Sequence, residues 1–163
     1  MFRSFNNIYK SQRLAHRRNI LMGPIFNQLR PSSIKPIQHI MYRTQPYSCF
    51  LFPCEDNTGL ESIINSSLTN NDKILVISNG TYAERIYHLS KKLEKNASML
   101  RFSNNLDIDV EDVKDIFDNY PEFTHASITH HEISTGKINN IKNISSLCTK
   151  YNKKLIIDSI YLK

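Results

Sequence analysis

An alternation of short apolar runs with stretches of helical period constrains the fold of this chain more than any other feature of its sequence. Four short runs have apolar centres: residues 73–78 (KILVIS), 98–102, 124–129 (THASIT) and 154–159 (KLIIDS). The first is bounded by polar residues, and all except 98–102 are rich in β-branched residues. Such runs are typical of buried strands. Strands that look buried on both faces and alternate with helices indicate βαβ units and a mostly parallel sheet. We therefore predict an α/β fold with flanking helices.

The predicted helices lie before and between these strands. Residues 58–68, 82–93, 110–117 and 141–151 carry apolar side chains at steps of three and four. Asp109 is placed to cap the third of these helices, because an aspartate side chain accepts a hydrogen bond from the first helical turn. In parallel sheets, ligands bind at the carboxyl ends of the strands. The residues to inspect for function therefore begin at Asn79, His130 and Asp158.

The positive charge of the chain is confined to its first third. Residues 1–54 contain eight lysine and arginine side chains and no acidic one, whereas the remainder has 13 basic and 15 acidic side chains. A basic, acid-free start is typical of an organelle-targeting segment, of an arm that meets nucleic acid or anionic lipid, or of a solvated tail. Arginine and serine among the apolar residues of 1–20 favour a mitochondrial presequence, with a cytoplasmic location as the alternative.

The domain organisation follows from the prolines and the charge. Pro24, Pro31, Pro36 and Pro46 are too closely spaced for a long helix, so residues 1–50 are predicted to be a targeting-like or irregular arm and residues 51–163 the folded part. No zinc-binding, helix-turn-helix or RNP-like pattern follows the arm, which argues against nucleic acid as a partner. No apolar run approaches the roughly 18 residues that a membrane-spanning helix needs. The three cysteines form no C-x-x-C pair and are predicted to be small buried hydrophobes.

Three strand ends carry groups with possible chemistry. Asn79 opens a loop that can place Tyr82 above a ligand, although a loop that merely starts a helix has the same appearance. His131 and Glu132 are interpreted either as an acid/base pair or as part of a metal site, but the spacing that brings two histidines to one metal ion is missing, so we predict no metal. Asp158 ends an apolar strand, where a carboxylate usually caps a helix, binds a metal or answers a cation.

Together the three segments resemble the class V pyridoxal-phosphate aminotransferases. SNGTYAERI (residues 78–86) is similar to the NGAYGERI-type segment of 2-aminoethylphosphonate:pyruvate aminotransferases. FTHASITHHEISTGKINNI (123–141) resembles their THVAVVHCETTTGILNPL, and KKLIIDSI (153–160) resembles their KTYIVDAM. Alanine:glyoxylate aminotransferases share ESSTG and VDS versions of the last two and are the second choice. The resemblance covers about residues 57–160 and implies a partial large domain of a fold-type I pyridoxal-phosphate transferase.

The resemblance implies a cofactor, pyridoxal 5'-phosphate, and four residues that bind it. Tyr82 falls where the family stacks an aromatic ring on the pyridine, and Asp158 falls where the family holds the protonated ring nitrogen. The family's glycine-rich phosphate turn has become Cys-Glu-Asp-Asn (residues 54–57), which leaves Asn57 and Thr58 as the phosphate-binding candidates. Ile133 replaces a small hydroxyl residue that would meet the cofactor in the family.

The implied function is that of an aminotransferase-like protein that cannot transaminate alone. In the family, the Schiff-base lysine follows a further strand and turn after the aspartate, whereas the sequence ends at Lys163, five residues after Asp158. We therefore predict no catalytic residue. The implied partners are an amino donor, a 2-oxo acid and a homologous subunit in a homo- or heterodimer. Alternatively, the chain is a non-catalytic interaction module that pairs with a full-length homologue. An unrelated nucleotide binder would need a G-x-G-x-x-G or P-loop, which is missing.

Overall fold

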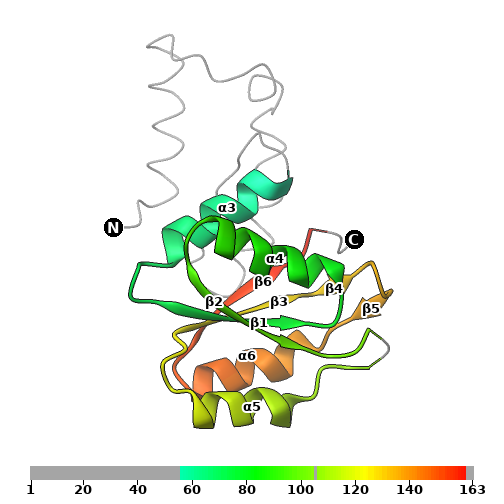
Figure 1. Ribbon diagram of the computed structural model, residues 1–163. Helices are drawn as coiled ribbons and strands as arrows, with labels where there is room; N and C mark the ends of the chain where they lie inside the picture. The colour runs from blue at the N-terminus through cyan, green and yellow to red at the C-terminus, as the bar shows by residue number, and fades with distance from the viewer. Residues whose placement is uncertain (1–55, 105, 161–163) are drawn as a thin grey trace, which may run out of the picture. The chain divides into compact units, whose positions relative to one another are not determined.

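The computed structural model describes residues 56–104 and 106–160 (Figure 1). The chain divides into two units, and these residues all belong to the second, residues 55–163. The predicted arm at residues 1–50 and the predicted targeting function lie outside the described residues. Cys49, Cys54 and Lys163 lie outside them as well.

The core of the unit is a parallel sheet of four strands. The strands are β1 (Lys73–Ser78), β2 (Asn96–Arg101), β3 (His125–Thr129) and β6 (Lys154–Asp158), in the spatial order β2-β1-β3-β6. All four predicted strands are present, and β2 begins two residues earlier than predicted. The prediction of an α/β fold with a parallel sheet is confirmed.

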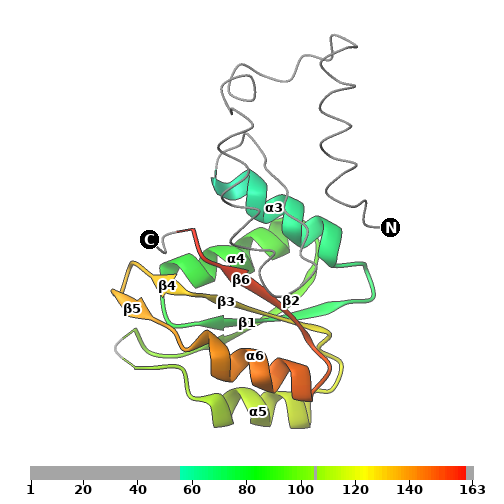
Figure 2. The same ribbon diagram turned by 180° about the vertical axis from the view of Figure 1, so that it is seen from behind.

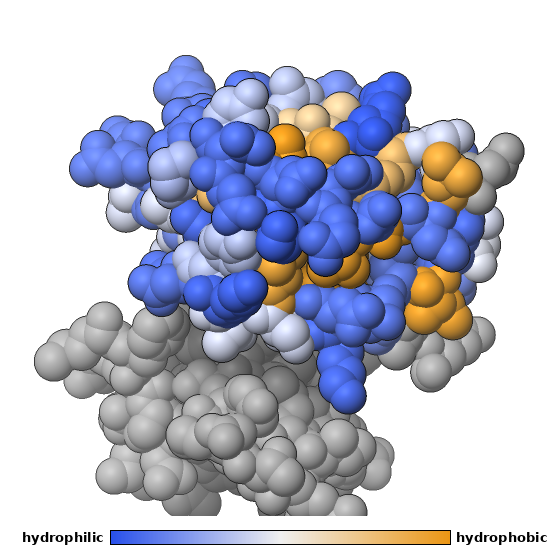
Figure 3. Space-filling model, turned by 90° about the horizontal axis from the view of Figure 1, so that it is seen from below, coloured by the Kyte–Doolittle hydropathy of each residue, from blue (hydrophilic) through white to orange (hydrophobic). Residues whose placement is uncertain are grey.

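Helices cover both faces of the sheet (Figures 1 and 2). Helices α3 (Asp56–Ser67) and α4 (Thr81–Lys92) lie on one face, and α5 (Val110–Asn119) and α6 (Ile141–Lys150) lie on the other. Asp109 caps α5 as predicted, since its side chain accepts a hydrogen bond of 2.9 Å from the N–H of Glu111. Seen from the side of α5 and α6, the outer surface is largely hydrophilic, as expected for amphipathic helices (Figure 3). None of the described helices is long and apolar enough to cross a membrane.

Two apolar clusters, one on each face of the sheet, hold the layers together. Alternate side chains of β1 belong to different clusters. Leu75 and Ile77 pack in the cluster of α5 and α6, whereas Ile74 and Val76 pack in the cluster of α3 and α4. Successive strand residues point to opposite faces, so a continuous apolar run suits a strand that is covered on both sides. The edge strand β6 differs from this expectation, because its Ile157 is 41% exposed.

A short hairpin follows β3 and was not predicted. Strands β4 (His131–Glu132) and β5 (Lys137–Ile138) pair antiparallel, and Gly136 turns the chain between them with a φ of 69°. Two-residue strands are too short to show a period in sequence, which explains why the pattern missed them. The hairpin projects at the carboxyl ends of the parallel strands, where ligands of such sheets bind (Figure 1).

Candidate functional site

Two of the predicted site residues meet at one guanidinium group. The carboxylate of Asp158, at the end of β6, is buried, with 4% of its side chain exposed. Arg85 Nη2 lies 3.3 Å from Asp158 Oδ2, and the N–H of Ile160 donates to Oδ1 at 3.3 Å. The guanidinium carbon of Arg85 lies 5.4 Å from the centroid of the Tyr82 ring. Tyr82 and Asp158 are thus connected through Arg85.

Local structure explains why these three residues converge. Ile156 packs in the cluster of α3 and α4, and side chains two apart on a strand share a face, so Asp158 also points toward α4. Tyr82 and Arg85 are three residues apart near the start of α4, a spacing that places both on one side of a helix. Arg85 was not identified as a site residue from the sequence, although it lies within the segment that carries the resemblance.

Unsatisfied polar atoms lie beside the carboxylate. Thr129 is the β3 partner of Asp158 in the sheet register, so their side chains point to the same face. Thr129 Oγ1 and Arg85 Nε are buried and have no hydrogen-bond partner among the described residues. Buried polar groups normally have partners, so two such atoms beside a buried carboxylate are typical of a site with binding capacity to spare.

Glu132 occupies the N-terminus of α4. It is completely buried; Oε1 accepts hydrogen bonds from the N–H of Tyr82 (3.2 Å) and of Ser134 (3.3 Å), and Oε2 accepts one from the N–H of Ala83 (3.0 Å). A carboxylate at this position satisfies orphan N–H groups and interacts favourably with the helix dipole. Both oxygens of Glu132 are therefore engaged in capping the helix, which disfavours the acid/base interpretation of this residue.

Ser134 completes the cap. Its hydroxyl donates to Glu132 Oε1 and accepts a hydrogen bond of 3.0 Å from the N–H of Thr81. Ile133, at the position where the resemblance expects a small hydroxyl residue, is 40% exposed. Among residues 56–104 and 106–160, no group of three or more histidine, cysteine, aspartate or glutamate side chains could hold a metal ion.

Two buried side-chain amides, of Asn79 and Asn139, bind each other at the carboxyl ends of the strands. Asn79 Nδ2 donates to Asn139 Oδ1 at 2.8 Å, Asn139 Nδ2 returns a bond of 3.1 Å, and Asn139 also donates to the carbonyl of Thr129 at 2.7 Å. This arrangement ties the end of β1 to the hairpin and to the end of β3. Asn79 thus has a structural role that the sequence did not indicate.

Asn57 and Thr58, the predicted phosphate-binding residues, lie in the first turn of α3. Both side chains are exposed. Figure 1 shows α3 and α4 starting on the same side of the molecule, the side toward which the parallel strands point. The first turn of α3 offers helix N–H groups and a positive dipole end, which suit an anion.

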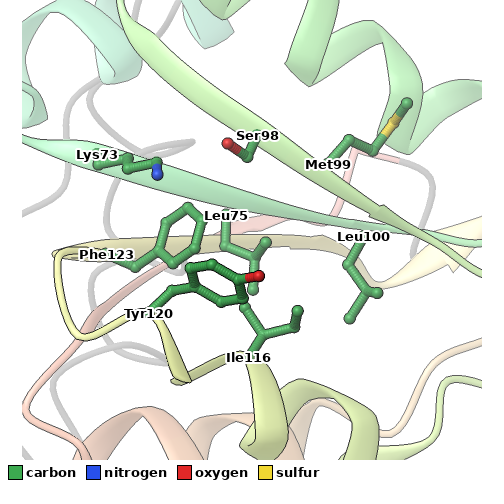
Figure 4. Close-up of a pocket in the computed structure, with 8 residues that line it drawn as sticks. All are labelled: Lys73, Leu75, Ser98, Met99, Leu100, Ile116, Tyr120 and Phe123. Atoms are coloured by element: carbon green, nitrogen blue, oxygen red, sulfur yellow. The ribbon is translucent and has the colours of Figure 1, made fainter. Parts of the chain in front are cut away.

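A hollow of about 230 Å³ lies elsewhere, against edge strand β2 (Figure 4). It is lined by Lys73, Leu75, Ser98, Met99, Leu100, Ile116, Tyr120 and Phe123. Lys73 starts β1, whereas Asp158 ends β6, so the hollow and the carboxylate belong to different ends and edges of the sheet. The hollow is therefore separate from the group around Arg85.

Known proteins similar to this chain include aminotransferases. The 2-aminoethylphosphonate–pyruvate transaminase of Phocaeicola vulgatus is 31% identical over 124 residues, which are 76% of this chain and 34% of that protein. A bifunctional phosphonoacetaldehyde hydrolase/aminoethylphosphonate transaminase of Clostridioides difficile is 29% identical over 117 residues, 72% of this chain and 18% of that protein. This chain spans about a third of the length of the first of these curated relatives. No family model matches it.

Solved structures agree on the fold. Pyridoxamine-pyruvate aminotransferase from Mesorhizobium loti superimposes with a TM-score of 0.57 at 28% identity, over 61% of this chain and 25% of that one. Alanine–glyoxylate aminotransferase from Nostoc sp. gives a TM-score of 0.60 at 16% identity, over 65% and 28% of the two chains. The described residues therefore have the fold of part of a fold-type I pyridoxal-phosphate transferase. Within that class, the chain is related to the 2-aminoethylphosphonate–pyruvate transaminases.

The groups around Arg85 fit the ring of pyridoxal phosphate. A pyridine ring in this cofactor needs a carboxylate for its protonated nitrogen and an apolar or aromatic surface for its face. Asp158 supplies a buried carboxylate, Tyr82 supplies a partly exposed ring, and Thr129 Oγ1 is a buried hydroxyl without a described partner. For the phosphate of the cofactor, the chain offers the first turn of α3, but it lacks the glycines that the family has in its phosphate-binding turn.

Proposed function

We propose that the described residues form the ring-binding part of a pyridoxal-phosphate site in an aminotransferase-like protein. The observation that carries the proposal is the buried carboxylate of Asp158, which pairs with Arg85, together with the Tyr82 ring that the same guanidinium contacts. The names of the relatives support an amino donor of the 2-aminoethylphosphonate type and a 2-oxo acid acceptor such as pyruvate. Pyridoxal phosphate, when bound, serves as the electron sink that lets an amino group leave one carbon and reach another.

Each of the four candidate residues has a distinct role in this proposal. Asp158 accepts a hydrogen bond from the protonated ring nitrogen and keeps that proton in place. Tyr82 packs its ring against the ring face and excludes water from it. Asn57 and Thr58 hold the phosphate at the positive N-terminal end of α3.

We further propose that amino transfer requires a lysine from outside the described residues. The resemblance calls for a lysine beyond the aspartate that ends β6. Several described lysines have partners elsewhere: Lys73 pairs with Glu122, Lys137 pairs with Asp107, and Lys95 donates to the carbonyl of Leu68. On this proposal, the described residues bind the cofactor ring but do not complete the reaction.

Binding of pyridoxal phosphate to the full chain tests the proposal. We expect saturable quenching of tyrosine fluorescence on titration and about a tenfold or greater weakening in D158N, because a hydrogen bond to a charged group is lost. D107N is the matched control, since Asp107 is an exposed carboxylate that pairs with Lys137. Absence of saturable binding, or equal affinity in D158N and the unaltered chain, would disprove the proposed site.

A second candidate function is pairing with another polypeptide through the β6 edge. Among residues 56–104 and 106–160, β6 pairs only with β3, and Ile157 and Ile160 are 41% and 47% exposed. Unpaired strand edges with exposed apolar side chains tend to bind further strands. This observation supports a non-catalytic interaction module, with a homologous subunit as the partner.

We also propose that residues 1–50 direct the protein to mitochondria. The absence of acidic residues from this segment and its arginines support the proposal. A fluorescent protein fused after residue 50 should co-localise with a mitochondrial marker. A fusion in which Arg13, Arg17 and Arg18 are replaced by glutamate should remain in the cytoplasm; the same distribution for both fusions would contradict the proposal.

A further inference from the structure

We propose that Arg85 is the positioning residue of the site: it fixes the Asp158 carboxylate and the Tyr82 ring relative to each other before the cofactor binds. This inference rests on the proposed function, because it concerns the same ring-binding group. Arg85 contacts both the Asp158 carboxylate and the Tyr82 ring, and it is not one of the four residues that the sequence indicated. The inference is carried by the geometry of three side chains from α4 and β6.

The carboxylate of Asp158 is restrained at both oxygens. Oδ2 faces Arg85 Nη2 at 3.3 Å, and Oδ1 faces the N–H of Ile160 at 3.3 Å. Two contacts on different oxygens define the plane of the carboxylate. A carboxylate has about four acceptor positions. Acceptor positions therefore remain for a protonated ring nitrogen.

The length of the Arg85 contact allows a further partner to bind. Charge-assisted N–H···O contacts are usually about 2.7–2.9 Å long, so 3.3 Å describes a loose ion pair. A buried carboxylate is costly unless a cation or several donors compensate its charge. Arg85 makes the ion pair of Asp158 among the described residues. The guanidinium therefore offers a cation to the carboxylate and leaves acceptor positions of the carboxylate open.

The same guanidinium group orients the aromatic ring. Its carbon lies 5.4 Å from the centroid of the Tyr82 ring, within the roughly 6 Å over which a cation is attracted to an aromatic face. A planar guanidinium can stack on a ring while it donates at its edge, whereas a lysine ammonium acts as a point charge. Arg85 therefore couples the two groups in a way that lysine reproduces only in part.

The first test needs no cofactor. In the full chain with 13C-labelled tyrosine, we expect the Tyr82 ring resonances to shift in R85Q and to recover only partly in R85K. R101Q is the matched control, because Arg101 forms an ion pair of 2.9 Å with Glu84, a carboxylate on α4, and is itself 58% exposed. A Tyr82 signal that responds equally to R85Q and R101Q would overturn the inference. Circular dichroism of each variant ensures that loss of the fold is not mistaken for the effect.

The second test measures the affinity of pyridoxal phosphate. We expect R85Q to weaken binding of pyridoxal phosphate about tenfold. The double variant R85Q/D158N should bind no more weakly than D158N alone, because either substitution already breaks the ion pair between Arg85 and Asp158. Effects of R85Q and D158N that multiply would contradict the coupling. If the unaltered chain fails to bind pyridoxal phosphate, the proposed function is wrong, while the Tyr82 resonances still decide whether Arg85 positions the ring.

Discussion

Gly80 occupies a position where the neighbouring side chains leave no space for a methyl group. A Cβ atom there would overlap Cγ and Cδ of Glu132 and lie 2.6 Å from Ser134 Oγ. The backbone of Gly80 is extended, with a φ of 175°, so any residue could adopt its conformation. The requirement for glycine is therefore steric, and it arises from the buried carboxylate that caps α4.

We expect G80A to reduce the free energy of unfolding by about 1–3 kcal/mol, because the Glu132 side chain must move away from the helix N–H groups. Urea denaturation of the full chain measures this change. G136A is the informative comparison, since Gly136 has a φ of 69° and open space around it. Its cost of about 1–2 kcal/mol comes from backbone strain alone. Only G80A should also change the environment of Tyr82; an unperturbed Tyr82 signal in G80A would contradict the packing described.

The charge of Glu132 contributes to stability separately from its shape. In E132Q, one carboxylate oxygen is replaced by an amide group that can only donate, and this group would face an N–H of α4 or Ser134. We expect E132Q to lower the free energy of unfolding by about 2–3 kcal/mol in urea denaturation. E122Q, at an exposed glutamate that pairs with Lys73, should cost much less, because solvent screens an exposed ion pair. Equal costs for the two variants would rule out the capping role.

At the scale of elements, the start of β3 carries a buried histidine. His125 is 1% exposed, its Nδ1 lies 2.8 Å from Thr124 Oγ1 and 3.7 Å from Asp72 Oδ1. Burial lowers the pKa of His125 below its usual 6.5; nearby Asp72 opposes this shift, and Lys154 adds to it. Hydrogen bonds from the side chain and backbone of Thr69 and from Thr124 lower the pKa of Asp72 from 3.8 to about 2.

Stability should therefore fall as the solution becomes acidic. Below about pH 6.5, the unfolded chain takes up a proton at His125 that the folded chain resists, so unfolding is favoured. The contribution of Asp72 is present above pH 3.8 and is lost as the pH falls toward 2. We expect the urea midpoint to decrease between pH 7 and pH 5, and to decrease less in H125F. H88Q, at an exposed histidine, should retain the full pH dependence; a flattened profile in H88Q would contradict the assignment to His125.

The elements themselves were largely predictable, and their edges were not. The runs KILVIS and THASIT form the interior strands β1 and β3. Helices cover both faces of these strands, and a continuous apolar run indicates a strand under this condition. KLIIDS shows the same pattern, yet as edge strand β6 it leaves Ile157 exposed. A run of residues does not reveal whether a neighbour lies on both sides of it.

The sequence predicted those site residues whose chemistry is evident from the residue type and its position. It did not predict residues that belong to the site only through contacts between distant segments. Tyr82 and Asp158 were indicated by their positions after strands and by resemblance. Arg85 and Thr129 became evident only when α4 and β3 were placed against β6. The sequence marks Glu132 as an acid, but the N–H groups that it caps lie about 50 residues away, and no local pattern indicates contacts over such a separation.

At the scale of the whole molecule, the exposed edge of β6 should influence association. We expect the full chain to form larger species with rising concentration in size-exclusion chromatography with light scattering, and I157K to shift the distribution toward the monomer, because a charge on an edge strand opposes strand pairing. I63K is the control, since Ile63 on α3 is similarly exposed, at 45%. A monomer at every concentration would contradict self-association of this chain through the β6 edge.

The cap that Glu132 places on α4 also sets the order in which the molecule can assemble. Helix α4 obtains acceptors for its first N–H groups from a hairpin that follows β3 in the chain, and closing a loop of about 50 residues has an entropic cost that must be met first. The middle of α4 can therefore form early, whereas its first turn becomes ordered only after β3 and the hairpin have docked. In native-state hydrogen exchange, the amides of Tyr82 and Ala83 should consequently exchange together with those of the hairpin. Each opening of the hairpin would also release the aromatic ring of the site.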